Sequence, residues 1–238
     1  MSKICLPLLI KPTLSPILKN KCWELVSRLP RANPQHQFEI IVDETPISLE
    51  QHERKTPWSK VTKARNNMLT KIDFDRYDYI LWIDTDVVDY PIDLPTRLIN
   101  ANPNGIAGGY IFVEKMVDRF YDCGAYIEEG SDHIQPDVFK EIRGRNVFCV
   151  GQHFSKPVKG LVKMDCIGSV INIPTDVYKT GVKHTDHPAY TDWHAICKKA
   201  REMGKTVICD TDLIILHANL DPQLNLYPGN HWHTTNNI

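Results

Sequence analysis

Short apolar segments alternate with helical patterns through the first half of the chain, and this alternation constrains the fold more than any other feature. Four apolar runs have the length and composition of strands: residues 4–10, 38–42, 79–83 and 105–113. Three helical patterns lie between them: residues 16–29, 60–72 and 94–100. Strands separated by helices are typical of a mostly parallel sheet with helices on its faces. We therefore predict an α/β fold with a mixed, mainly parallel sheet.

The second half of the chain is less regular. Residues 113–161 are rich in polar and turn-forming residues, so they form either an antiparallel insertion or partly mobile loops. After them we expect a strand, two helices and two short strands, in this order: residues 163–174, 174–180, 190–203, 205–209 and 213–217. Residues 218–238 form a polar tail. A length of 238 residues without an internal repeat favours a single domain.

The charges of the chain are almost balanced. There are 28 lysines and arginines against 29 aspartates and glutamates, which gives a net charge of −1. Such a chain has no overall basic field that would attract nucleic acid or anionic lipid. No apolar run approaches the roughly 18 residues that cross a bilayer. We therefore expect neither a nucleic-acid partner nor a membrane span.

The cysteines and the N-terminus indicate the compartment. Pro7 interrupts the first apolar run and no small-residue cleavage site follows it, so we interpret the run as a buried strand and not as a signal peptide. The seven cysteines are scattered and include no Cys-x-x-Cys pair. An odd number of cysteines without a signal peptide favours free thiols in a reducing compartment. We expect a cytoplasmic protein.

The tripeptide Asp-Thr-Asp occurs twice, and its first copy, Asp84 to Asp86, directly follows the apolar run 79–83. Strands of an open α/β sheet present their carboxyl ends to the ligand-binding crevice. Two close carboxylates there suit Mg²⁺ or Mn²⁺, which prefer oxygen ligands and can carry a diphosphate. We predict a metal site at Asp84 and Asp86. The alternative is that both aspartates only cap the following turn.

The second copy, Asp210 to Asp212, lies between two short apolar runs. Because so little chain separates the runs, we expect a tight turn, where aspartate is favoured since its side chain bonds nearby backbone amides. His217 ends the second run. A histidine at a strand end is more often structural than a ligand, but His217 could complete an Asp, Asp, His site together with diphosphate oxygens.

The order of these segments resembles that of nucleotide-sugar-dependent glycosyltransferases of the GT-A fold, including small virus- and microbe-encoded transferases. Six features within residues 4–217 carry the resemblance: an early strand-helix pair, KARNNML, ILWIDTD, MDCIGSVINIP, TDWHAICKKAREMGK and a late strand that ends in His217. The resemblance implies a GT-A, Rossmann-like sheet, a UDP- or GDP-sugar donor and a glycan or glycoprotein acceptor. Residues 1–112 would form the nucleotide-binding half and residues 113–217 the acceptor side. For a virus-encoded chain the cytoplasm would be the host's.

The resemblance also implies roles for residues on the donor side. Asp86 and His217 would be the protein ligands of Mn²⁺ or Mg²⁺. Asp84 would approach the ribose or sugar of the donor and a metal-bound water. Arg65 would hold the nucleotide end of the donor, unless it lies on a solvated helix face. The base pocket would be lined by Leu6, Pro7 and Asp43.

On the acceptor side, the resemblance implies that Asp192 is the general base of an inverting transfer. A base must reach the proton of the acceptor hydroxyl, and the dipole at a helix start favours a carboxylate. The family usually has Glu-Asp where this chain has Thr191-Asp192, and either residue could instead be an N-cap. Asp165 could bind acceptor or sugar hydroxyls. Gly168 would let the backbone approach the donor sugar closely.

Two other functions fit parts of the sequence. The segment DTDVV matches the Asp-x-Asp-x-Thr/Val pattern of haloacid-dehalogenase-like phosphatases, in which Asp84 would be the nucleophile and the second tripeptide would supply Mg²⁺ ligands. That group carries its nucleophile on the first strand, whereas here two strand-helix units come first. The other alternative is a non-catalytic module that binds sugar nucleotides. We expect HTDH, residues 184–187, to lie in a loop and HWH, residues 231–233, in the tail.

Overall fold

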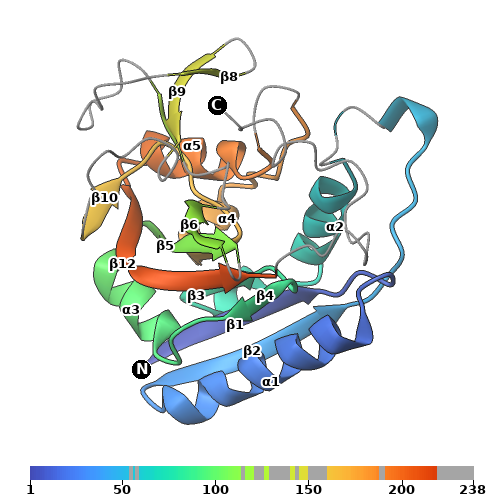
Figure 1. The fold of residues 1–238 in the computed structure, drawn as a ribbon, viewed down its shortest axis with the longest axis vertical. Coiled ribbons are helices and arrows are strands. Elements are labelled where there is room, and N and C mark those ends of the chain that lie inside the picture. Colours follow the sequence, from blue (N-terminus) through green and yellow to red (C-terminus); the bar gives the residue numbers. More distant parts are fainter. Residues whose placement is uncertain are drawn as a thin grey trace.

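The computed structural model describes residues 1–53, 56, 59–113, 116–120, 126–128, 140–142, 145–149, 160–187 and 191–218. Its centre is a sheet with helices on both faces (Figure 1). The strands of this sheet are β1 (Ser2–Leu9), β2 (His36–Asp43), β3 (Tyr79–Ile83), β4 (Val87–Asp89), β5 (Ile106–Val113), β6 (Met116–Phe120), β10 (Leu161–Lys163), β11 (Val170–Pro174) and β12 (Val207–His217). The α-helices are α1 (Pro16–Ala32), α2 (Ser59–Leu69), α3 (Leu94–Ala101), α4 (Thr175–Lys179) and α5 (His194–Glu202).

The strands lie in the order β10-β12-β5-β11-β3-β1-β2, with β4 beside β12 and β6 beside β5. β1 pairs in parallel with β2 and β3, and β12 pairs in parallel with β5. β11 runs antiparallel to both of its neighbours, β3 and β5. In the main path β1, β2, β3, β5 and β12 therefore point the same way. The predicted α/β fold with a mixed, mainly parallel sheet is confirmed.

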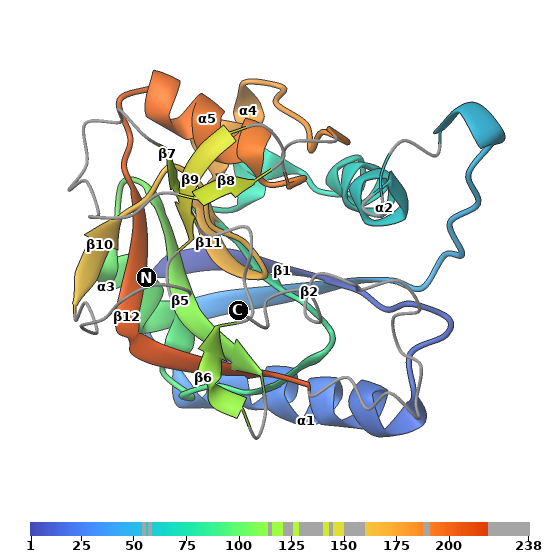
Figure 2. The same ribbon diagram turned by 45° about the horizontal axis from the view of Figure 1, so that its top comes forward.

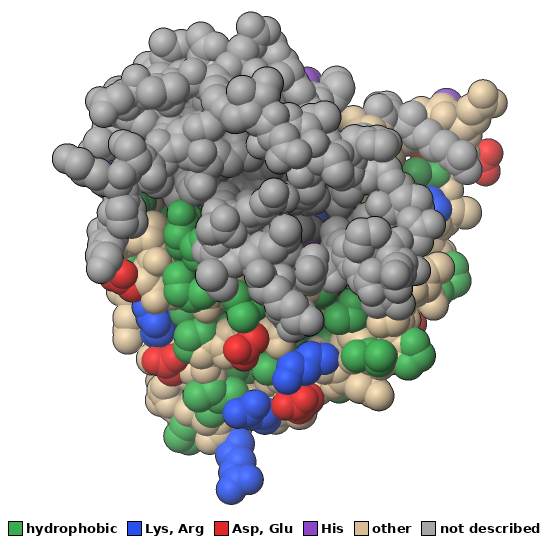
Figure 3. Space-filling view, viewed as in Figure 1, with side chains coloured by type: hydrophobic (Ala, Val, Ile, Leu, Met, Phe, Trp, Pro, Cys, Tyr) green, Lys and Arg blue, Asp and Glu red, His purple; other side chains and the backbone are tan. Residues whose placement is uncertain are grey.

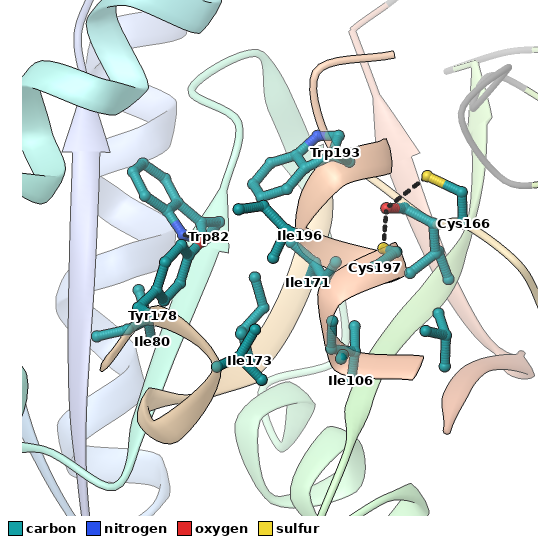
Figure 4. Packing of buried hydrophobic residues seen from close by; sticks show 14 of the residues in the cluster. Ile80, Trp82, Ile106, Cys166, Ile171, Ile173, Tyr178, Trp193, Ile196 and Cys197 are labelled. Atoms are coloured by element: carbon teal, nitrogen blue, oxygen red, sulfur yellow. Dashed lines mark hydrogen bonds between the residues drawn. The ribbon is translucent and has the colours of Figure 1, made fainter. Parts of the chain in front are cut away.

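Side chains of the central strands alternate between two cores. In β3, Leu81 and Ile83 belong to the core beneath α1 and α3, whereas Ile80 and Trp82 belong to the core beneath α2, α4 and α5. This period of two is expected for a strand that is buried on both faces. Figure 4 shows part of the second core, where Trp82 and Trp193 approach each other. The molecule thus has three layers, with the sheet in the middle.

The first two crossovers define a switch point in the sheet. β1 leads through α1 to β2 on one side, and β2 leads through α2 to β3 on the other side of β1. α1 and α2 cover opposite faces of the sheet. Ligands of open α/β sheets bind beyond the carboxyl ends of the strands at such a point. The fold therefore directs attention to the ends of β1 and β3.

The prediction of two short strands joined by a tight turn at the second Asp-Thr-Asp is wrong. Residues Val207–His217 form one strand, β12, which pairs in parallel with β5 on both sides of the tripeptide. The register jumps from Asp210 opposite Gly109 to Ile214 opposite Tyr110, so the residues between form a bulge. β12 bends sharply there (Figures 1 and 2). A bulge keeps the strand running forward along β5, whereas a hairpin would have reversed it.

The irregular region contains a second sheet. The strands β7 (Tyr126–Glu128), β8 (Lys140–Ile142) and β9 (Arg145–Cys149) form an antiparallel sheet in the order β7-β9-β8. Of the two alternatives for residues 113–161, the described part therefore follows the antiparallel insertion. The strand predicted over residues 163–174 is divided into the end of β10 and β11, because the chain turns between them at Ser169, which has a φ of 60°.

The helix predicted over residues 190–203 begins later, since α5 starts at His194 and its N-cap is Trp193, so the alternative that Thr191 or Asp192 is the N-cap is wrong. β3 has the bounds that the apolar run predicts, and α3 and β5 differ from the prediction by one residue. Among the described residues, no helix combines the length and the apolar character that crossing a membrane requires. On the described part of the face in Figure 3, basic and acidic side chains lie interspersed.

Candidate functional site

The first Asp-Thr-Asp forms a turn at the switch point, between β3 and β4. The amide of Val87 donates to the carbonyl of Asp84 at 3.0 Å. The Thr85 hydroxyl donates to the carbonyl of Leu9, at the end of β1, at 3.3 Å. The amide of Asp84 donates to the carbonyl of Ser169, just before β11, at 3.1 Å. These bonds hold the tripeptide at the carboxyl edge of the sheet.

His217, the last residue of β12, lies beside Asp86. Its Nε2 is 3.1 Å from Oδ1 of Asp86. The exposed fraction is 0% for His217 and 4% for Asp86. β4 follows Asp86 directly and pairs with β12, so that His217 lies opposite Val87, and the amide of Ala218 donates to the carbonyl of Asp86 at 2.8 Å. Strand pairing therefore joins two predicted metal ligands that are distant in the sequence.

The other ring nitrogen of His217 fixes its tautomer. Nδ1 lies 3.1 Å from the carbonyl oxygen of Ala218, which can only accept a hydrogen bond, so Nδ1 carries a hydrogen. Burial lowers the pKa of His217, but the Asp86 charge outweighs it and raises the pKa. Metal-ligating histidines are held in this way, with one nitrogen on a carbonyl and the other on the metal. The pair therefore fits a divalent cation, which would replace a proton on Nε2.

Asp84, the third predicted ligand, faces a different partner. Its Oδ1 accepts a hydrogen bond from Nη2 of Arg65 at 2.7 Å. Within the described ranges, no three histidine, cysteine, aspartate or glutamate residues gather into one metal-holding group. Two protein ligands still suit Mg²⁺ or Mn²⁺, because Mg²⁺ commonly keeps several waters and takes phosphate oxygens from the substrate. The arrangement fits a cation on Asp86 and His217, with Asp84 beside them.

Lys11 brings a second positive charge to Asp86. Its Nζ lies 3.6 Å from Oδ2 of Asp86, and 43% of its side chain is exposed. Burial would raise the pKa of Asp86, but the charges of His217 and Lys11 lower it below its usual range. Asp86 is therefore a carboxylate whose two oxygens face two different cationic side chains. Lys11 was not among the residues that the sequence singles out, although its position just after the first strand is a usable signal.

Arg65 joins the first Asp-Thr-Asp to the residues before α5. Its Nη2 donates to Asp84, and its Nη1 donates to Oδ2 of Asp192. The guanidinium carbon lies 4.1 Å from the centroid of the Trp193 ring, which is a cation–π contact. Only 4% of Arg65 is exposed. It is therefore not on a solvated helix face, and it bridges both carboxylates that the sequence assigns to the donor and the acceptor.

His184 supports Asp192 through a chain of hydrogen bonds. Its Nδ1 lies 3.2 Å from the backbone carbonyl of Asp192. Its Nε2 lies 3.4 Å from the Tyr178 hydroxyl, which accepts from Nε1 of Trp82 at 3.0 Å. Burial lowers the pKa of His184 to about 3, so the ring is neutral, and a hydrogen on Nδ1 satisfies every bond of the chain. The polar stretch HTDH contains no local signal for this buried role.

Gly168 and Ser169 form the turn that precedes β11. A Cβ on Gly168 would lie 2.5 Å from Cδ1 of Trp193, so the packing of this ring requires glycine. The predicted close approach of the backbone thus occurs towards Trp193, and its use for a donor sugar stays a prediction. Ser169 has a φ of 60°, which is uncommon for a residue other than glycine, and it is the residue that receives the Asp84 amide. Backbone strain here lies beside the site.

The residues predicted to line a base pocket lie along β1 and β2. Leu6 is fully buried in the core beneath α1, and Pro7 is buried next to it. Asp43 ends β2, where its Oδ2 lies 2.7 Å from Nζ of Lys71 and its Oδ1 accepts from the Thr45 amide at 3.0 Å. Asp43 therefore reaches the same edge of the sheet as Asp84, whereas the Leu6 side chain lies in the core. A contact of these residues with a base stays a prediction.

Asp165 is engaged in the interior on the side of α5. Its Oδ1 lies 2.7 Å from Nη1 of Arg201, and 1% of the residue is exposed. Binding of a sugar hydroxyl by Asp165 stays a prediction. The pair His231 and His233 lies outside the described residues.

The second Asp-Thr-Asp is not part of the candidate metal site. Oδ2 of Asp210 accepts from Nη2 of Arg97 at 2.9 Å, and Oδ1 accepts from the Asp212 amide at 3.0 Å. Asp212 itself is exposed. The phosphatase alternative requires late carboxylates beside the first tripeptide, and the carboxylate of Asp210 instead pairs with α3. The two copies therefore differ in structure, as the sequence predicts, although the second lies in a bulge and not in a turn.

Comparison with known proteins gives likenesses to solved structures. No protein-family model and no curated protein matches the chain. The chain is similar to a protein described as a nucleotide-diphospho-sugar transferase from Desulfovibrio desulfuricans G20, with a TM-score of 0.42, 12% identity and coverage of 97% of this chain and 91% of that one. It is also similar to a glycosyltransferase involved in the glycosylation of the major capsid of PBCV-1, with a TM-score of 0.42, 12% identity and coverage of 94% and 98%. Likenesses at this level assign no chemistry.

Proposed function

We propose that the chain is a metal-dependent glycosyltransferase, which moves a sugar from a UDP- or GDP-sugar to a hydroxyl of a glycan or glycoprotein. The observation that carries the proposal is the pair of Asp86 and His217 at the switch point of the sheet, with 3.1 Å between Oδ1 and Nε2. A carboxylate and an imidazole whose other nitrogen bonds a carbonyl suit Mn²⁺ or Mg²⁺. When bound, the cation supplies Lewis-acid stabilisation of the leaving diphosphate.

Arg65 and Asp84 act beside the cation in this proposal. The Asp84 side chain is 29% exposed, against 6% for Asp86, so Asp84 is the carboxylate that a hydroxyl of the donor reaches more easily. Arg65 holds Asp84 through Nη2 and is itself fixed by the Trp193 ring. A buried, stacked guanidinium keeps its direction because its planar fork is pre-organised. Arg65 thus orients the group that contacts the donor.

Asp192 is the general base in this proposal, and the transfer is inverting. Arg65 Nη1 and His184 Nδ1 both approach Oδ2 of Asp192, the latter at 3.6 Å. The acceptor hydroxyl would therefore meet Oδ1. Only 3% of Asp192 is exposed, so the acceptor must bind closely enough to reach a covered carboxylate. If Asp192 only positions Arg65, the transfer needs a different base.

A thermal-shift screen tests the proposed function. UDP- and GDP-sugars are added with Mn²⁺ or with EDTA, and a ligand that binds only the folded state raises the apparent stability. We expect one nucleotide class to raise the Tm in the presence of Mn²⁺ and to be hydrolysed slowly without an acceptor. Asp86→Asn should lose the Mn²⁺-dependent shift. Asp212→Asn, at the exposed residue of the second tripeptide, is the matched control and should keep it.

The same screen separates the alternatives. Hydrolysis of p-nitrophenyl phosphate with Mg²⁺, abolished by Asp84→Asn, would indicate a phosphatase. A Tm shift with a nucleotide sugar but no hydrolysis and no transfer to any tested glycan would indicate a binding module. Absence of a shift with every nucleotide sugar, with or without Mn²⁺, would overturn the proposed function.

A further inference from the structure

We propose that Lys11 opposes metal binding in the nucleotide-free protein and turns to the diphosphate when metal and donor bind together. Lys11 would thereby couple the two ligands, so that the metal binds weakly alone and tightly with the nucleotide. The inference rests on the proposed function, because it assumes that Asp86 and His217 hold the cation. It assigns a new role to a residue outside the predicted site.

The basis of the inference is how the charge of Asp86 is balanced. His217 Nε2 lies 3.1 Å from Oδ1, and Lys11 Nζ lies 3.6 Å from Oδ2. Each oxygen of this buried carboxylate therefore faces a nitrogen of a basic side chain of the protein itself. A divalent cation on Asp86 can take the place of a hydrogen on Nε2 of His217, whereas the ammonium of Lys11 stays beside Oδ2. The two like charges then repel each other.

Exposure decides which of the partners can move. Asp86 is 4% exposed and is held by the amide of Ala218 and by the pairing of β4 with β12. The Lys11 side chain is 43% exposed. It ends in a flexible four-carbon stem, so its ammonium can turn while Asp86 stays in place. A diphosphate bound to the cation carries more negative charge than the carboxylate of Asp86, which the cation already occupies. The diphosphate is therefore the better partner for the Lys11 ammonium.

The size of the effect follows from the exposure of Lys11. Near a surface the interaction of charges is screened, so the repulsion amounts to about a tenfold change in the dissociation constant of the metal. Coupling between two ligands is reciprocal. Lys11 should therefore increase the effect of nucleotide on metal affinity by about the same factor.

Titration of the full-length chain with Mn²⁺, with the free ion measured by electron paramagnetic resonance, tests the inference. It is carried out on the wild type, Lys11→Met and Lys19→Met, each alone and with saturating UDP or GDP. Lys19 is the matched control, because it pairs with the exposed Glu44 at 2.8 Å and its removal changes the net charge equally. The Tm of each variant verifies the fold.

We expect Lys11→Met to bind Mn²⁺ about tenfold more tightly than the wild type without nucleotide, and to gain about tenfold less from the nucleotide. Lys19→Met should behave like the wild type. If the wild type binds Mn²⁺ and Lys11→Met binds it equally or more weakly without nucleotide, this inference is overturned and the proposed function stands. If no variant binds Mn²⁺ with or without nucleotide, the metal site itself is wrong, and both proposals fall.

Discussion

Nε2 of His217 lies 3.1 Å from Oδ1 of Asp86, and both side chains are buried at one end of the pairing between β4 and β12. The His217 ring is fixed from its other side by the carbonyl of Ala218. Asp86 and His217 each stabilise the charged form of the other, so the two side chains stay together without a metal. They form a preformed pair that a cation can enter by displacing one proton.

The first prediction concerns His217→Gln. Glutamine can still form a hydrogen bond with a carbonyl, but it has no imidazole nitrogen to offer to a cation. We therefore expect the affinity for Mn²⁺ in the presence of UDP or GDP to fall at least about tenfold, because even the loss of a residue that only supports a metal ligand lowers metal affinity by about this factor. Binding is measured by the resonance signal of free Mn²⁺. His36→Gln is the matched control, since its Nε2 lies 3.2 Å from Thr96 Oγ1, away from the site. Equal affinity of His217→Gln and wild type would remove His217 from the metal site.

The second prediction concerns the buried guanidinium of Arg65. Arg65→Met leaves Asp192 and Asp84 without their cation, and removing one partner of a buried ion pair costs about 3–5 kcal/mol. We expect a loss of this size in the free energy of unfolding, measured with urea. Arg76→Met should cost less than about 1 kcal/mol, because both members of its pair with Glu39 are exposed.

The double variant Arg65→Met/Asp192→Leu tests whether this cost arises from the uncompensated charge. Replacing both members of a buried pair by apolar groups is often close to neutral. We therefore expect the double variant to regain part of the stability that Arg65→Met loses. Additive losses would show that packing against Trp193, and not the charge, dominates.

The parts of the fold that follow from local pattern are those that the sequence predicts well. The apolar run of β3 and the acidic turn after it need only their neighbours in the sequence, so the position of Asp84 and Asp86 at a strand end is predictable. The fold class follows from the same alternation of strands and helices. The metal-site geometry of these residues stays a prediction that the Mn²⁺ titrations check.

The parts that depend on distant neighbours could not be predicted in this way. Asp210 to Asp212 have the composition of a turn, but β5 lies beside both halves of β12 and turns the tripeptide into a bulge. Gly109 makes this possible, because a Cβ there would lie 2.4 Å from Cδ1 of Ile215. Likewise, the partners of the buried His184 come from distant elements: its ring packs edge-on against Trp82, and Asn66 Oδ1 receives its amide at 2.9 Å. No sequence window contains these partners.

The third prediction uses two neighbouring residues with opposite requirements. Ser169 has a φ of 60°, a conformation that costs an ordinary residue about 1–2 kcal/mol and glycine almost nothing. Ser169→Gly should therefore raise the free energy of unfolding, by up to about 1 kcal/mol after the entropy of the unfolded glycine is subtracted. Gly168→Ala should lower it by about 1–3 kcal/mol, because the new Cβ meets the Trp193 ring at 2.5 Å. Urea unfolding checks both, and a destabilised Ser169→Gly would contradict the assignment of strain.

The last prediction concerns the neutral His184. Burial lowers its pKa to about 3, whereas an unfolded histidine titrates near 6.5, so the unfolded chain binds one more proton between these values. His184 should therefore cost no stability above about pH 6.5 and should reduce it progressively as the pH falls towards 3, by about 1.4 kcal/mol per pH unit. His184→Gln removes this titration. Urea unfolding at several pH values should show that the free energy of unfolding falls less between pH 6.5 and 4.5 in the variant than in the wild type. At pH 7.5 the variant should be less stable than the wild type. Parallel pH profiles of variant and wild type would mean that the pKa of His184 does not differ between the folded and the unfolded protein.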